Sequence, residues 1–268
     1  MERKKALITG ASHGIGQTVA AALAKAGYDV AVNYRKNADG AKETARLIEE
    51  AGGRALLLQA DVRSCEELEA MFEKYQQEFK TIDLMVNNAG VSEFYPLLEI
   101  TEKQWERITF TDWKGTFFGT QMAARLMVKT KKPGVIINMG SNHVDGCWPK
   151  ANTYAPSKAA VTRFGKSAAY ELAPYGIRVL TLSPGYTNVW PEDHPVQEVA
   201  PRLLLKRFAK PEEIANILVF LASDACNYMT GTTVTVDGGA LLPIYAENDL
   251  NGGSPFDHME NPFGGNEL

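Results

Sequence analysis

Short apolar runs alternate with longer amphipathic stretches along most of the chain. Each run has the length of a buried strand, and each stretch repeats its apolar residues at the spacing of a helix. Strands are predicted at residues 5–9, 29–34, 54–59, 82–86, 135–141, 177–182 and 232–236. Helices are predicted at residues 17–27, 42–51, 64–79, 101–129, 154–174 and 211–222. This alternation predicts an α/β fold in which a doubly wound parallel sheet carries helices on both faces.

Two of the predicted helices begin with a capping-box pattern. Ser64 is followed by Glu67, and Thr101 is followed by Gln104, at the spacing that such a box requires. The hydroxyl then accepts a backbone N–H of the first turn, and the Glu or Gln side chain reaches back to the cap. These patterns fix where both helices should start.

Two segments lie outside the alternation. Residues 186–210 are rich in proline, charged and aromatic residues and contain no predicted strand, so we expect a lid or binding loop. Residues 243–268 form a C-terminal tail rich in glycine, asparagine and proline, which either wanders or packs across a neighbouring subunit. No linker or repeat divides residues 1–242, so we expect them to form a single domain.

The composition narrows the classes of function. The chain has 268 residues, a hydrophobic content of 45% and a net charge of −4, with no long basic run. These values favour a large core and argue against nucleic acid as a partner. No apolar run approaches the roughly 20 residues of a membrane span, and the N-terminal segment lacks the pattern of a signal peptide. We therefore expect a cytoplasmic protein with no membrane partner.

The cysteines do not form a recognisable site. Cys65, Cys147 and Cys226 lie far apart in the sequence. Their spacing fits neither a zinc site nor a disulfide framework, so we expect no metal. Reduced thiols also fit a cytoplasmic location.

Polar or small residues follow five of the predicted strands. They are the glycine turn at residues 10–16, Asp61, Asn88, Ser141, and Pro184 with Gly185. The carboxyl ends of parallel strands meet at one edge of a sheet, and ligands of such sheets bind there. The sequence therefore predicts one ligand site to which all five contribute.

The glycine turn lies between the first strand and the first helix. Its glycines allow the backbone to turn tightly and to approach a pyrophosphate at the helix N-terminus. The residues of this turn that we expect to contact a dinucleotide are Gly10, Ser12, His13, Gly14, Ile15 and Gly16.

The end of the second strand indicates which dinucleotide binds. A carboxylate there would bind the ribose 2′-hydroxyl of NAD, but the chain has Tyr34, Arg35 and Lys36. Two cations favour the 2′-phosphate of NADP, and His13 would add to that site. The alternatives are that NAD binds, or that Arg35 and Lys36 are only solvated loop residues.

Two further strand ends are expected to contact the cofactor. Asp61 and Val62 form a predicted edge for the adenine ring. Asn88, Ala89 and Gly90 are small enough to leave room for a ligand against the backbone. The asparagine side chains of this segment also have a structural use, because they can satisfy buried polar groups of neighbouring strands.

Ser141, Tyr154 and Lys158 form the candidate catalytic group. Tyr154 and Lys158 are four positions apart, so they lie on one face of the predicted helix. A cation beside a phenol favours the phenolate and should lower a pKa that starts at about 10. Such a phenol can pass a proton to or from an alcohol or carbonyl oxygen. Ser141, at its strand tip, is placed to hydrogen-bond the same oxygen.

Together these motifs resemble those of the short-chain dehydrogenase/reductase family. The resemblance covers residues 3–242. It rests, in the family's order, on Thr9-Gly10-x-x-x-Gly14-x-Gly16, Asn87-Asn88-Ala89-Gly90, Ser141, Tyr154-x-x-x-Lys158 and Pro184-Gly185. It implies a Rossmann-type, dinucleotide-binding catalytic domain over residues 1–242.

The resemblance also implies an activity. A hydride would pass between a nicotinamide and a carbonyl or alcohol carbon. Tyr154 would be the general acid in reduction and the base in oxidation, Lys158 would bind the nicotinamide ribose, and Ser141 would orient the substrate oxygen. Pro184 and Gly185 would contact the cofactor. Family members are usually homotetramers that assemble through the two long helices and the last strand, and a homodimer is the alternative.

Two positions depart from the family's pattern. Asp112 stands where the family usually has an asparagine whose main-chain carbonyl holds a water of the proton relay. A carbonyl survives the change, so Asp112 stays a candidate catalytic residue. Val189 stands where a threonine commonly binds the nicotinamide carboxamide. We expect Thr187 or main-chain groups to make that contact.

Some segments are similar to bacterial glucose 1-dehydrogenases, namely residues 30–35 and the residues around Ser141 and Trp148. A sugar site combines an apolar face for ring C–H groups with polar groups for hydroxyls. The candidate substrate contacts are Glu93, His143, Trp148, Tyr186 and Trp190. The sequence thus predicts a sugar or polyol substrate. The alternatives are a steroid, a ketoacyl group or another small ketone.

Two rival functions are weighed against this enzyme. One is a regulatory protein that senses NADP(H), which the intact Ser, Tyr and Lys set disfavours. The other is a dehydratase or epimerase of nucleotide sugars. Such chains usually carry a larger C-terminal substrate domain than the residues after Tyr186 can form.

Overall fold

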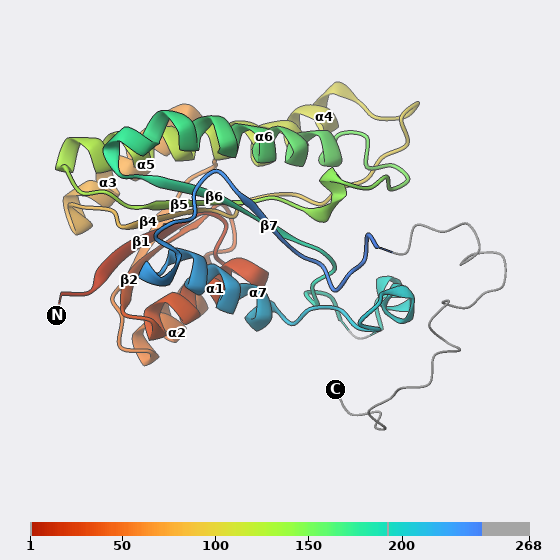
Figure 1. Cartoon of the computed structure of the whole chain (residues 1–268), viewed down its shortest axis with the longest axis horizontal. Helices are drawn as coiled ribbons and strands as arrows, with labels where there is room; N and C mark the ends of the chain where they lie inside the picture. The colour runs from red at the N-terminus through yellow and green to blue at the C-terminus, as the bar shows by residue number, and fades with distance from the viewer. Residues whose placement is uncertain (1, 192, 243–268) are drawn as a thin grey trace.

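Seven parallel strands form one sheet between two layers of helices in the computed structural model, which describes residues 2–191 and 193–242 (Figure 1). The strands are β1 (Lys4–Ile8), β2 (Tyr28–Tyr34), β3 (Ala55–Gln59), β4 (Leu84–Asn87), β5 (Val135–Met139), β6 (Arg178–Pro184) and β7 (Thr233–Val236). Their order in the sheet is β3-β2-β1-β4-β5-β6-β7. The chain therefore reverses its direction of travel between β1 and β4, as in a doubly wound Rossmann-type sheet. The predicted fold class is confirmed.

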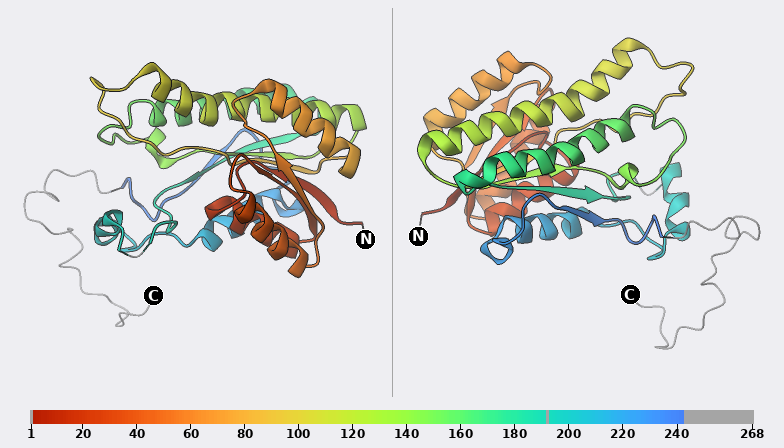
Figure 2. Two further views of the ribbon diagram at one scale, coloured as in Figure 1. Left: turned by 180° about the vertical axis from the view of Figure 1, so that it is seen from behind. Right: turned by 45° about the horizontal axis from the view of Figure 1, so that its top comes forward.

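The helices divide between the two faces of this sheet, and the views of Figure 1 and Figure 2 agree on the division. One layer contains α1 (Gly14–Lys25), α2 (Ala38–Glu50) and α7 (Pro211–Ala222). The other contains α3 (Cys65–Phe79), α4 (Glu102–Thr109), α5 (Gly115–Thr130) and α6 (Tyr154–Leu172). Crossover connections of one hand produce this arrangement when every strand is parallel.

Each face of the sheet packs into its own hydrophobic cluster. Along β1, Ala6 and Ile8 point into the cluster formed with α1 and α7. Leu7 points the other way, into the cluster formed with α3, α5 and α6. Successive side chains of a strand face opposite sides, so a strand buried on both faces is apolar throughout. This is why the strands were visible as continuous apolar runs.

Two helices begin earlier than predicted. α1 begins at Gly14, inside the glycine turn, instead of at residue 17. α2 begins at Ala38 instead of residue 42, because the side chain of Asn37 caps it by accepting the N–H of Gly40 at 3.0 Å. The glycine turn is therefore shorter than the sequence suggested, and it delivers the chain directly into a helix N-terminus.

The helix predicted at residues 101–129 is divided in the middle. The capping box of Thr101 and Gln104 is present and starts α4. A π-helical turn, η1 (Phe110–Lys114), then separates α4 from α5. At Ser64 only one half of the expected box forms, because the Glu67 carboxylate accepts the N–H of Asp61.

The predicted lid at residues 186–210 contains a 3₁₀ helix, η4 (Pro195–Arg202). A β-bridge pairs Thr187 with Ala209, so the two ends of the segment lie side by side. No named strand occurs among the described residues of this segment. Its role as a lid stays a prediction. The predicted tail at residues 243–268 lies outside the described residues.

None of the helices in residues 2–191 and 193–242 has the length and hydropathy needed to cross a bilayer. Over the same ranges, no three His, Cys, Asp or Glu side chains gather into a group that could hold a metal ion.

Candidate active site

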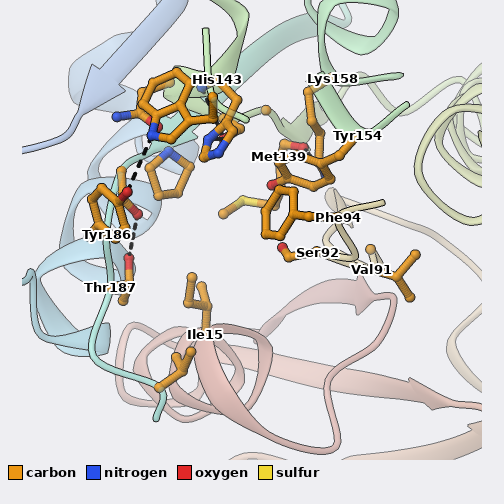
Figure 3. A pocket seen from close by; sticks show the side chains of 18 of the residues that line it. Ile15, Val91, Ser92, Phe94, Met139, His143, Tyr154, Lys158, Tyr186 and Thr187 are labelled. Carbon is orange, nitrogen blue, oxygen red and sulfur yellow. Dashed lines mark hydrogen bonds between the residues drawn. The ribbon is translucent and has the colours of Figure 1, made fainter. Parts of the chain in front are cut away.

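A cavity of about 380 Å³ lies beyond the carboxyl ends of the central strands (Figure 3). It brings together residues from four of the five predicted strand ends, whereas Asp61 is not among the residues that line it. The predicted site residues that line it are Ile15, Asn88, Gly90, Ser141, His143, Trp148, Tyr154, Lys158, Pro184, Gly185, Tyr186, Thr187 and Trp190. Ser141, Tyr154 and Lys158 thus share one chamber with Pro184, Gly185 and Thr187. Asp112 is not among the residues that line it, and of the glycine turn only Ile15 is.

Tyr154 and Lys158 enter this chamber from the first turns of α6. The ammonium Nζ of Lys158 lies 5.7 Å from the centre of the Tyr154 ring. Nζ also donates a hydrogen bond of 3.0 Å to the carbonyl oxygen of Met139, at the end of β5. Both side chains are buried. The cation is therefore fixed next to the phenol, which is the geometry expected from their spacing.

A buried carboxylate faces Lys158 from the π-turn η1. Asp112 Oδ2 lies 3.6 Å from Lys158 Nζ, and Asp112 Oδ1 accepts the backbone N–H of Val91 at 2.8 Å. Asp112 has no solvent exposure. Burial raises the pKa of Asp112 more than Lys158 and Val91 lower it. Burial acts against the charged form of Lys158, but Asp112 and Tyr154 outweigh it and raise the pKa of Lys158.

Ser141 follows β5 and is held by His143. Its Oγ accepts the backbone N–H of His143 at 3.2 Å, and Nδ1 of the His143 ring lies 3.2 Å from the same oxygen. Burial lowers the pKa of His143 to about 4, so the ring is neutral near pH 7. In the tautomer with the proton on Nδ1, the ring donates to Oγ and leaves the serine hydroxyl proton free for a ligand oxygen.

The glycine turn forms a cradle with no room for side chains. Gly10 has φ +62, and a Cβ there would lie 2.9 Å from Cα of Ala89. A Cβ on Gly16 would lie 2.5 Å from Nδ2 of Asn88, which donates to the carbonyl oxygens of Thr9 and Gly10. The cradle opens onto the N-terminus of α1, whose first turn holds no acidic residue. These residues fit the pyrophosphate of a dinucleotide.

Cations gather around Asp61, close to the ends of β2 and β3. Nε of Arg63 donates to both carboxylate oxygens of Asp61 at 3.0 Å, and Nη1 of Arg35 lies 3.9 Å from Oδ2 of the same carboxylate. Burial would raise the pKa of Asp61, but these hydrogen bonds and charges lower it below its usual value. One carboxylate thus compensates two guanidinium groups, and Lys36 beside them is exposed.

The neighbouring positions in this region were also predicted as cofactor contacts. Val62 is buried against Gly115, and Tyr34 is half-buried at the end of β2. Ser12 Oγ lies 3.2 Å from Nδ1 of His13, which precedes Gly14. All of them stand at the carboxyl edge of the sheet, on the side of β1 that leads to β3.

Glu93 does not line the cavity, contrary to its prediction as a substrate contact. Its carboxylate accepts from Nε of Arg107 at 2.9 Å and from the Tyr95 hydroxyl at 3.1 Å. The physical reason is the ion pair, since α4 presents Arg107 to the loop that carries Glu93. That pairing partner comes from another element, which sequence spacing did not reveal.

Thr187 and Val189, the two positions discussed for the nicotinamide contact, both line the cavity. Thr187 is buried, and its hydroxyl donates to the carbonyl oxygen of Gly185 at 3.2 Å. Val189 reaches toward the glycine turn, where a Cβ on Gly14 would lie 3.7 Å from its Cγ1. The contact of Thr187 or of main-chain groups with the nicotinamide stays a prediction, and Val189 adds an apolar surface to the cavity.

Sequence reasoning missed three functional positions. Phe94 stacks on His143, the Met139 carbonyl holds Lys158, and the Val91 N–H holds Asp112. The last two act through the backbone, so their residue types carry no signal. Phe94 did carry one, because a large aromatic residue in a long loop after a strand end is a candidate for a ligand wall.

Comparison with known proteins finds relatives across almost the whole chain. A family model described as enoyl-(acyl carrier protein) reductase matches residues 10–240. A 3beta-hydroxysteroid dehydrogenase 1 from Eggerthella lenta is 37% identical over 248 residues, covering 90% of this chain and 95% of the relative. A 3-oxoacyl-(acyl-carrier-protein) reductase from Staphylococcus epidermidis is 37% identical over 246 residues, covering 89% of this chain and 99% of the relative.

A solved structure shares both the fold and the sequence pattern. It is a short-chain type dehydrogenase/reductase from Mycobacterium marinum, with a TM-score of 0.85 and 37% sequence identity. The match covers 90% of this chain and 96% of that chain. The relatives therefore span the glycine turn, the catalytic group and the last strand together.

Proposed function

The chain belongs to the short-chain dehydrogenase/reductase superfamily and is an oxidoreductase of CH–OH groups, and we propose that it reduces a carbonyl compound with NADPH or runs the reverse oxidation. One observation carries the proposal. Tyr154, Lys158 and Ser141 line the same cavity as Ile15 of the glycine turn and Pro184 after β6. Proton-transfer groups and a dinucleotide cradle therefore open onto one chamber.

The bound nicotinamide would supply or accept the hydride, and the side chains would manage the proton. Tyr154 gives its hydroxyl proton to the carbonyl oxygen in reduction and takes it back in oxidation. Lys158 keeps a positive charge 5.7 Å from the centre of the Tyr154 ring and would hold the nicotinamide ribose. Ser141 donates a hydrogen bond to the reacting oxygen and stabilises the charge that develops there. Asp112 holds Lys158 from behind, as a member of the same polar network.

The cofactor that we propose is NADP(H), with NAD(H) as the alternative. The support is the excess of cations around the end of β2, where Asp61 already compensates Arg63 and Arg35. A 2′-phosphate placed there would meet guanidinium groups, which bind phosphate in a planar, bidentate manner. Lys36 adds a further positive charge in solvent.

The substrate is a small carbonyl or alcohol compound. The classes weighed are the sugar or polyol predicted from the sequence, and a steroid, a ketoacyl group or another small ketone. The names of the relatives include a hydroxysteroid dehydrogenase and an oxoacyl reductase, and neither name defines the substrate of this chain. The residues that line the chamber distinguish between these substrate classes.

We also propose that the chain assembles as a homotetramer, with a homodimer as the alternative. An apolar groove of about 470 Å³ runs between α5 and α6 on the outer side of their layer. Phe117 and Phe164 line it, together with Val128, which is 38% exposed, and Tyr175, which is 55% exposed. A second copy of the same helix pair would cover these side chains.

Purified protein tests the enzymatic proposal directly. We expect wild-type protein to consume NADPH with a carbonyl compound, with a higher kcat/KM for NADPH than for NADH. Tyr154→Phe should lose about 100-fold or more in kcat, because the proton donor is gone. NADPH binding, measured by fluorescence titration, should be unchanged. The control is Tyr170→Phe, since Tyr170 is 85% exposed on α6.

Two results would contradict the proposal. Full activity of Tyr154→Phe would exclude the phenol as proton donor. Cofactor binding by wild-type protein without turnover of any carbonyl or alcohol would favour the regulatory, NADP(H)-sensing alternative. A higher kcat/KM with NADH would overturn only the cofactor assignment.

A further inference from the structure

We propose that the substrate is a ketone or secondary alcohol carried on an apolar ring system, and that Phe94, His143 and Trp148 form the wall that binds this ring. The inference rests on the proposed function and specifies its substrate class. It excludes the sugars and polyols that the sequence favoured. His143 of this wall and the catalytic Tyr154 line the same cavity (Figure 3).

The aromatic wall stands directly beside the catalytic phenol. The rings of His143 and Trp148 stack at 3.9 Å between centroids, and those of Phe94 and His143 at 5.7 Å, with interplanar angles of 20° and 18°. Tyr154 meets the His143 ring edge-on at 5.2 Å and the Phe94 ring edge-on at 5.6 Å. Any substrate whose oxygen reaches the Tyr154 hydroxyl must therefore place its neighbouring atoms close to this wall.

Two of the three ring nitrogens in the wall already have partners within the protein, namely Nε1 of Trp148 and Nδ1 of His143. The indole N–H of Trp148 donates to the Tyr186 hydroxyl at 3.2 Å, and Tyr186 in turn stacks on Phe208. Nδ1 of His143 faces Ser141 Oγ. The neutral imidazole adds no charge to the wall. What the wall offers a ligand is mainly ring carbon.

Several polar side chains in and around the cavity are also committed elsewhere. The Glu93 carboxylate is paired with Arg107 and lies outside the cavity lining. The side-chain amide of Asn142 faces Asp237, and that of Asn88 donates to the Thr9 and Gly10 carbonyls. Lys158 carries the only charge among the described residues that line the cavity. It is bound to Met139 and Asp112, in the catalytic group itself.

Most of the other side chains that line the cavity are apolar. Val91, Val189, Trp190 and Val196 contribute carbon surface, and Ser92 contributes a hydroxyl. A polyol would have to leave several hydroxyl groups without partners in this chamber, and each such group weakens binding. An apolar ring would instead exchange water for contact with aromatic carbon. A rigid ring also loses little conformational freedom against a wall whose members hold one another in place.

The experiment compares substrates that differ in one property at a time. Cyclohexanol and myo-inositol share a six-membered carbon ring and differ in their hydroxyl groups. Decalone and the acyclic methyl ketone with the same number of carbons share their size and differ in the ring. With NADP or NADPH, we expect kcat/KM for cyclohexanol to exceed that for myo-inositol by about 100-fold or more. We expect kcat/KM for decalone to exceed that for its acyclic counterpart by about tenfold.

Variants of Trp148 connect this preference to the wall. Trp148→Ala should lower kcat/KM for decalone by about tenfold or more, mainly through KM, and should leave the KM for NADPH unchanged. Trp148→Phe keeps an aromatic ring and loses the N–H, so it should restore most of the wild-type value. Tyr228→Ala is the control, because Tyr228 is a fully exposed aromatic residue outside the cavity.

The outcomes separate this inference from the proposed function. Turnover of myo-inositol or glucose equal to that of cyclohexanol would overturn the substrate class and leave the oxidoreductase intact. Equal kcat/KM values for decalone and for its acyclic counterpart would contradict the preference for a ring system. If Trp148→Ala left the kinetics with decalone unchanged, the aromatic wall would not bind the substrate ring. Failure of every substrate with NADPH bound would overturn the proposed function, and the inference with it.

Discussion

His143 joins the proposed substrate wall to the catalytic serine. Its ring stacks on Trp148, and its Nδ1 lies 3.2 Å from Ser141 Oγ. Burial lowers its pKa to about 4 from an ordinary value of 6.5. The folded chain therefore keeps this ring neutral at pH values where an unfolded chain would protonate it.

We expect His143 to make the folded state less stable as the pH falls from about 6.5 to about 4. In this window the unfolded chain binds a proton that the folded chain does not, so the free energy of unfolding decreases. His143→Phe lacks the titrating group, and its Tm should fall less between about pH 7 and about pH 4.5 than that of the wild type. Thermal unfolding at these two pH values measures the difference.

His194→Phe provides the matched control, because His194 is exposed outside the wall. It should show the same fall in Tm as the wild type. An equal fall in His143→Phe would mean that protonation of His143 does not differ between the folded and unfolded chains.

Residues with a fixed local spacing were the easiest to identify from the sequence. Tyr154 and Lys158 face each other because any helix places such positions on one side. Glu93 lacked such a constraint, because its carboxylate is directed by Arg107 on α4. Phe94 belongs to the same loop, and its stacking on His143 depends on how that loop crosses the strand ends. Loop paths depend on tertiary contacts, which a single sequence does not display.

The π-turn η1 is the local feature that carries Asp112 to Lys158. It interrupts what the sequence predicted as one helix, between α4 and α5. Such turns occur often at functional sites, because the extra residue in the turn changes which side chains face inward. Here the inward residue is a carboxylate 3.6 Å from a buried ammonium, with Tyr154 on the other side of that ammonium and Glu93 as a further nearby negative charge.

Replacing this carboxylate by its amide should change the pH dependence of the reaction. In Asp112→Asn, Lys158 loses the negative charge that raises its pKa, so the pKa of Lys158 should fall. We expect the basic limb of the kcat/KM profile for alcohol oxidation to move to lower pH, by about one unit, because Lys158 loses its proton at a lower pH. Steady-state rates measured across the pH range give the displacement.

Asp39→Asn makes the same chemical change on the exposed face of α2 and should leave the profile in place. If Asp112→Asn also leaves the limb in place, the carboxylate does not compensate Lys158 during catalysis. Its role would then be limited to holding Val91.

All seven strands were predicted within a few residues, whereas the starts of α1 and α2 were less accurate. Strands buried on both faces form continuous apolar runs, which makes them visible in the sequence. Helix starts depend on capping. Asn37 caps α2 ahead of its apolar pattern, and α1 begins within a glycine turn where helix propensity is low. The π-turn has no sequence signature comparable to a cap.

The proposed tetramer would cover the apolar surface that α5 and α6 leave open. We expect Val128→Arg to shift the assembly toward smaller species, because the added cation would have to lose its water in the contact between two copies. Light scattering coupled to size-exclusion chromatography measures the mass. Gln77→Arg, on the exposed side of α3, adds the same charge outside the groove and should not change the mass. A measured mass equal to that of one chain in the wild-type protein would contradict the proposal.

Because every strand runs in the same direction, the cavity and the beginning of β1 lie at opposite edges of the sheet. β1 begins at Lys4, and the cavity lies beyond the other ends of the strands. A peptide tag or a surface linker attached ahead of Glu2 would therefore leave the chamber mouth unobstructed. Immobilised protein tethered in this way should admit bulky compounds as freely as protein in solution.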